Sequence, residues 1–90
     1  MKFLQQLSSA ADLPDEVIPG LPLIEISGTQ RVLVEHHNGV IDYSAEEIGI
    51  RVKFGSVFVS GENLTLSRMT RSMLIISGVI HGVMLIREES

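Results

Sequence analysis

The sequence predicts an all-β protein, a small antiparallel β-sandwich or partly open barrel of about eight short strands in four repeats. Apolar and polar residues alternate from Leu23 onward, as they do in strands that bury one face. Asn38-Gly39 stands between two alternating runs and predicts a hairpin, because both residues tolerate positive φ. Four serines end short apolar runs at intervals of 17, 16 and 17 residues: Ser27, Ser44, Ser60 and Ser77.

Residues 1–21 differ from the rest and are expected to form a helix and a connector before an all-β domain of residues 22–90. Three apolar residues near the start have helical spacing: Phe3, Leu4 and Leu7. This spacing predicts a short amphipathic helix over about residues 2–11. Pro14 disfavours helix at the residue before it, and Pro19-Gly20 is typical of a connector.

From residue 22 onward the expected strands come in consecutive pairs. In each pair an apolar run is followed by a Ser-Gly or Ser-Ala turn and then by a second apolar run. The pairs are residues 23–26 with 32–35, 40–43 with 48–54, 57–59 with 64–67, and 73–76 with 83–86. Glycine supplies positive φ at tight turns at no steric cost. Structural turns are therefore expected at Gly28, Gly39, Gly61 and Gly78.

Two other arrangements fit the same pattern. One is a single curved meander covered by the N-terminal helix. The other is a β-solenoid, whose coils also repeat at short fixed periods and stack equivalent positions in parallel. The hairpin expected at Asn38-Gly39 favours antiparallel pairing, and therefore favours a sandwich or barrel.

Composition excludes several classes of function. The chain carries 7 Lys and Arg against 11 Asp and Glu, a net charge of −4, whereas a nucleic-acid surface needs a basic patch. The most apolar stretch, residues 73–86, is shorter than the roughly 20 residues of a spanning helix, so no membrane span is expected. The start has no apolar run of signal-peptide length, and a cytoplasmic location is expected. No cysteine is present to form a disulfide or a thiolate metal site.

No group of residues predicts catalysis. The four spaced serines have no adjacent base, and we expect their hydroxyls to bond local backbone. His36 and His37 point to opposite faces of a strand and are not expected to bind one metal together, whereas Glu35 and His37 share a face. A metal site of Glu35, His37 and His81 is therefore an alternative. We therefore expect a non-enzymatic protein without a cofactor or metal.

The last two apolar runs, Met73–Ile76 and Val83–Ile86, are apolar on both faces. Strands of this kind are normally covered on both sides, which is difficult in so small a domain. One face is therefore expected to bind a partner or a second copy, and the residues expected in this interaction surface are Ile75, Val83 and Leu85.

Three stretches together resemble a known family. They are residues 12–17 (DLPDEV), residues 34–41 (VEHHNGVI) and residues 55–66 (GSVFVSGENLTL), in this order and spacing. The chain resembles the YabP/YqfC family of sporulation proteins, in its YqfC branch, over nearly its whole length. It departs at Asn38, where similar sequences commonly have a basic residue, and at Ala45, which interrupts the Ser-Gly pattern.

The resemblance implies a small all-β protein that acts in endospore formation, with spore cortex assembly linked to the YabP branch. It implies a location on the mother-cell side, in the cytoplasm or peripheral at the forespore membrane, and a membrane-protein partner, YqfD. No enzymatic activity or cofactor comes with it. Two alternatives to such an interaction module remain: a self-assembling structural scaffold, and a small ligand- or metal-binding β domain.

Overall fold

The computed structural model describes residues 20–88, and within them all the regular structure is β-strand. The strands are β1 (Leu23–Ser27), β2 (Arg31–Glu35), β3 (Val40–Tyr43), β4 (Glu47–Val52), β5 (Gly55–Met69) and β6 (Met73–Arg87). They form one open sheet in the order β1-β2-β6-β5-β4-β3, and every neighbouring pair is antiparallel. No helix in this part of the chain could cross a membrane. The helix expected over residues 2–11 lies outside the described residues.

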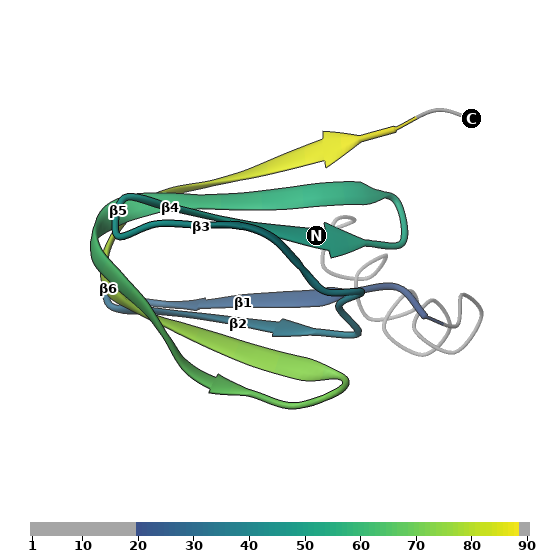
Figure 1. Ribbon diagram of the computed structural model, residues 1–90, viewed down its shortest axis with the longest axis horizontal. Helices are drawn as coiled ribbons and strands as arrows, with labels where there is room; N and C mark the ends of the chain where they lie inside the picture. Colours follow the sequence, from purple (N-terminus) through teal and green to yellow (C-terminus); the bar gives the residue numbers. More distant parts are fainter. Residues whose placement is uncertain (1–19, 89–90) are drawn as a thin grey trace, which may run out of the picture.

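The sheet folds over on itself because β5 and β6, at 15 residues each, are long enough to serve two layers. The start of β6 pairs with β2, whereas the start of β5 pairs with β4. Figure 1 shows the resulting two layers facing each other. We call them the β2 half (β1, β2, the start of β6 and the end of β5) and the β4 half (β3, β4, the start of β5 and the end of β6).

The core lies between these halves. Its buried members are Val32, Val34, Ile48, Ile50, Val52, Val57, Val59, Leu64, Leu74, Ile76 and Ile80. Those on β2, β4, the start of β5 and the start of β6 occupy alternate positions, so one face of each strand contributes to the core. Complete burial of one such aliphatic side chain contributes about 1.5–3 kcal/mol. The alternation expected from the sequence therefore identifies the buried face.

Two glycines permit the bend of β5 and β6. A Cβ on Gly61 would overlap the carbonyl oxygen of Val79 on the neighbouring strand. A Cβ on Gly78 would lie 2.7 Å from the carbonyl oxygen of Asn63, and φ of Gly78 is 141°. The pairing register of β5 with β6 shifts at the same place, between Ser60 and Gly61. The two backbones therefore cross from one half to the other in close contact, where a side chain has no room.

The prediction of a small antiparallel all-β domain is confirmed, but the described residues form six strands instead of about eight. The first two serines lie at turns: Ser27 ends β1, and Ser44 follows β3. The last two, Ser60 and Ser77, lie inside β5 and β6 beside the bend. Each of the last two predicted pairs is therefore one long bent strand. Antiparallel pairing throughout contradicts the parallel stacking of a solenoid.

The hairpin expected at Asn38-Gly39 is wrong. The strands before and after it do not pair: β2 lies between β1 and β6, and β3 pairs with β4. The Asn38 amide donates to the carbonyl of Arg51 (2.7 Å), and the Arg51 amide donates to the carbonyl of Gly39 (2.8 Å). Gly39 has a φ of 114°, as a turn residue would. This segment therefore carries the chain from the β2 half to the β4 half.

Candidate interaction surface

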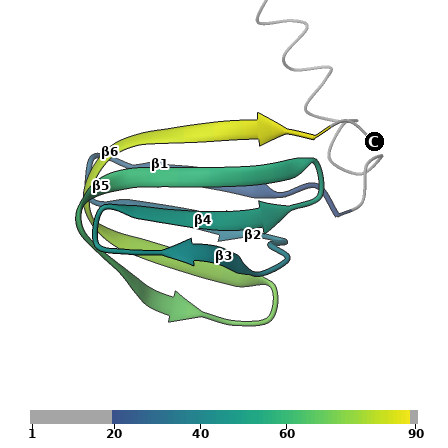
Figure 2. The same cartoon turned by 45° about the horizontal axis from the view of Figure 1, so that its top comes forward.

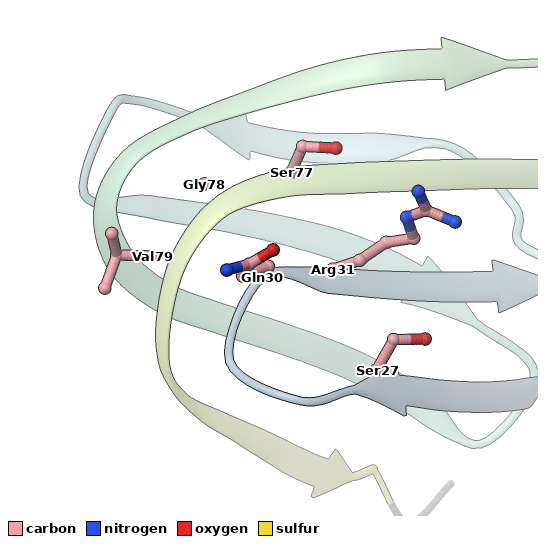
Figure 3. A pocket seen from close by; sticks show the side chains of 6 residues that line it. All are labelled: Ser27, Gln30, Arg31, Ser77, Gly78 and Val79. Atoms are coloured by element: carbon pink, nitrogen blue, oxygen red, sulfur yellow. The ribbon is translucent and has the colours of Figure 1, made fainter.

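A polar hollow of about 610 Å³ lies beside the turn between β1 and β2, and Figure 3 shows the side chains around it. Ser27, Arg31 and Ser77 are direct cross-strand neighbours on β1, β2 and β6. The remaining lining residues are Gln30, Gly78 and Val79. A guanidinium flanked by hydroxyls is chemically suited to a small anion. No histidine or carboxylate lines the hollow, so it offers no base to activate a serine.

Two of the four spaced serines, Ser44 and Ser77, have hydroxyls that bond nearby groups. Ser44 Oγ accepts hydrogen bonds from the amides of Glu46 (3.2 Å) and Glu47 (3.0 Å), which fixes the turn before β4. Ser77 Oγ lies 2.8 Å from the hydroxyl of Ser67 on β5. Of the four glycines expected at turns, Gly28 (56°), Gly39 and Gly78 have positive φ. The turn prediction is wrong for Gly78 and Gly61, which lie inside β6 and β5 at the bend. Gly61 also has a φ outside the left-handed region, and close backbone contact explains why it is glycine.

The histidines do not form the alternative metal site. His37 is 7% exposed, and its Nδ1 accepts a hydrogen bond from the Gly39 amide at 3.0 Å. Because an amide can only donate, Nε2 carries the ring proton and donates it to the carbonyl of Thr70 at 2.9 Å. His81 instead pairs with Glu62 at 3.0 Å. Within residues 20–88 no three His, Asp or Glu side chains are grouped to hold a metal ion.

The residues expected in the interaction surface lie on two different parts of the sheet. Ile75 is half-buried on the β2 half, where it pairs with Leu33. Val83 and Leu85 lie on the end of β6, in the β4 half. Val83 is half-buried against the core, whereas Leu85 is 57% exposed. The structure therefore separates Ile75 from the other two.

The end of β6, residues 82–87, forms a free margin of the β4 half, and we call it the β6 edge. Figure 2 shows it as the outermost strand of its layer, with β5 on its inner side. The pairing of β6 with β2 stops at Ser77, so no described strand pairs with the outer side of this edge. Its three consecutive exposed apolar residues are Met84 (61%), Leu85 (57%) and Ile86 (38%).

An apolar patch extends from the edge over the outer face of the β4 half. Gly49, Phe58 and Met84 are consecutive partners across β4, β5 and β6. The Phe58 ring covers Gly49, because a Cβ there would lie only 2.6 Å from Phe58 Cε1. Sequence reasoning missed Phe58, Met84 and Ile86 as surface residues. The signal for the last two was the apolar character of both faces of residues 83–86.

Charged side chains mark both ends of the β6 edge. Arg87 is the last residue of β6, and it pairs with Gly55, the first residue of β5. The other end begins beside His81, which is paired with the carboxylate of Glu62. Between them, residues 82–86 carry no charge. Glu88, which is exposed, follows Arg87 directly, so the edge is an apolar strip with a cation and a carboxylate at one end and the His81–Glu62 pair at the other.

Comparison with known proteins identifies relatives. The family model of the YabP family matches residues 22–90. The chain is also similar to a Bacillus subtilis (strain 168) protein named "Uncharacterized protein YqfC". The two are 27% identical over 77 residues, which cover 86% of this chain and 83% of the relative. No solved structure matches the chain.

Proposed function

The chain belongs to the YabP family, and from this we propose that it is a non-enzymatic protein of endospore formation that works by binding another protein. The resemblance to the YqfC branch supports the sporulation role. The similarity to the Bacillus subtilis relative spans most of both chains, which supports comparing the two as whole proteins.

The observation that carries the binding role is the β6 edge, whose outer side pairs with no strand of residues 20–88. Natural sheet edges are commonly blocked by charged side chains, proline, bulges or a covering segment, because free backbone groups attract other strands. The middle of β1 carries Glu25, and β3 carries Asp42, both exposed. The β6 edge has no such residue between Gly82 and Ile86. It therefore suits recognition by strand addition, in which backbone hydrogen bonds give affinity and side chains give specificity.

The chemistry of the described residues also favours binding over catalysis. Both ring nitrogens of His37 are engaged with backbone groups, so this buried histidine is not poised as a base. The hydroxyls of the polar hollow have no base among the lining residues.

The partner and the location follow the resemblance. The protein would act on the mother-cell side, in the cytoplasm or peripheral at the forespore membrane, held there by the membrane protein YqfD. Two experiments in the native host test this. Deleting the gene should lower the yield of heat-resistant spores, and tagged protein from sporulating cells should recover YqfD. Wild-type spore yield after deletion would contradict the sporulation role, and absence of YqfD would contradict the partner.

A further inference from the structure

We propose that the β6 edge binds the β6 edge of a second copy, so that two chains share one continuous antiparallel sheet. This inference rests on the proposed use of the edge as a binding surface, and it names the occupant. The two β4 halves would join side by side across a two-fold axis. The self-complementary pattern of apolar side chains along residues 82–86, with no charge among them, is the basis for choosing a second copy.

Antiparallel pairing of two identical edges matches apolar residues with apolar residues. With Leu85 on the two-fold axis, each Leu85 lies opposite its counterpart, and Met84 of one chain lies opposite Ile86 of the other. Residues of the same parity face the same side of a sheet. Met84 and Ile86 therefore remain on the outer face beside Phe58, while Leu85 remains on the core side, where it pairs with Val57. Cross-strand apolar pairs of this kind stabilise sheets.

The charges at the ends of the edge select the same orientation. With Leu85 on the axis, Arg87 of one chain lies opposite Val83 of the other chain, and Glu88 lies opposite Gly82. A parallel alignment would place Arg87 against Arg87. The antiparallel arrangement thus keeps the two Arg87 side chains apart and forms no like-charge contact between arginines.

Symmetry also sets the size of the assembly. An isologous contact uses the same surface on both chains, so it closes at two. The other strands at the margins of the sheet carry Glu25 on β1 and Asp42 on β3, which oppose further growth. The structure thus favours a closed dimer over an extended scaffold.

The test is sedimentation or light scattering of the purified full chain, with charged substitutions at the centre of the contact. Wild-type protein is expected to be a concentration-dependent dimer. Leu85→Lys and Leu85→Glu, each alone, should weaken the dimer about 100-fold, because like charges would lie opposite each other across the axis. An equal mixture of the two should dimerise again, which an unfolded variant could not do. The matched control is Leu23→Lys on β1, where the side chain is similarly exposed (51%) and dimerisation should be unchanged.

The other outcomes overturn the inference. A wild-type chain that stays monomeric shows that the edge is covered by another protein or by another part of this chain. Assembly beyond two chains shows that the contact is not isologous. Loss of the dimer in Leu23→Lys but not in Leu85→Lys shows that the dimer contact lies on β1. Because these measurements use purified protein, they are independent of spore yield. If the purified chain is monomeric while deletion of the gene lowers spore yield, the dimer is rejected and the proposed function is not.

Discussion

The close contact of β5 and β6 at the bend predicts that Gly61→Ala strongly destabilises the fold. A Cβ at this position would overlap the carbonyl oxygen of Val79 and would lie 3.0 Å from both the Val79 carbonyl carbon and Leu64 Cδ2. Two of these three atoms belong to the backbone of the neighbouring strand, which cannot move without disturbing its pairing. Overpacking costs about 1–3 kcal/mol, and one weakened backbone hydrogen bond adds about 1 kcal/mol. We expect a total of about 3 kcal/mol.

Thermal unfolding followed by circular dichroism measures this loss. In a domain of this size, 1 kcal/mol corresponds to about 4–8 °C in Tm, so Gly61→Ala should lower Tm by roughly 12–24 °C. Gly82→Ala is the matched control, because its Cβ would meet only Ser60 Oγ, at an ordinary distance of 3.5 Å. This control should shift Tm by less than about 4 °C, since alanine suits a strand interior better than glycine. Equal melting temperatures for the two variants would refute the role of close backbone contact in the bend.

Two further stability predictions follow from burial. His37→Ala should cost about 2–3 kcal/mol, because the Gly39 amide and the Thr70 carbonyl lose their partner, whereas exposed His36→Ala should cost less. Leu74→Ala should cost about 2–5 kcal/mol in urea unfolding, because Leu74 is 0% exposed in the core. The half-exposed Leu23→Ala is its control, expected within about 0.5 kcal/mol of wild type. Equal losses within either pair would contradict the assigned burial.

The class of fold and the core could be predicted because both depend on local pattern. Successive side chains of a strand point to opposite faces whatever the strand pairs with. The sequence alone therefore places Val32 and Val34 on one face of their strand, and Ile48 and Ile50 on one face of theirs, and these faces are buried. Topology depends on pairing between distant segments, which the pattern does not encode. Asn38-Gly39 has the composition of a hairpin, yet its flanking strands pair elsewhere.

The strand count was missed for a related physical reason. A Ser-Gly pair after an apolar run indicates that the regular strand is interrupted. The interruption can be a turn between two strands or a bend inside one strand, and both require the same residues. Ser27-Gly28 is a turn between two strands, whereas Ser60-Gly61 is a bend inside one. What distinguishes them is the backbone of β6 that packs against Gly61.

The candidate surface was predicted only in part. The apolar character of both faces of residues 83–86 correctly indicated incomplete coverage, because a chain of 90 residues has few strands to cover them. Which of these apolar residues are exposed depends on which strands lie beside them, and the sequence pattern does not give this. Met84 is exposed because no strand of the described residues lies beyond it, whereas Ile75, in an equally apolar run, has Leu33 beside it on β2.

The measurement that tests the central claim most directly is the yield of heat-resistant spores in a deletion strain complemented with edge variants. Leu85→Lys, expressed at the wild-type level, should fail to restore the yield, because it places a charge in the middle of the β6 edge. Leu23→Lys on β1 should restore it. Full restoration by Leu85→Lys would contradict the claim that this protein acts through the β6 edge.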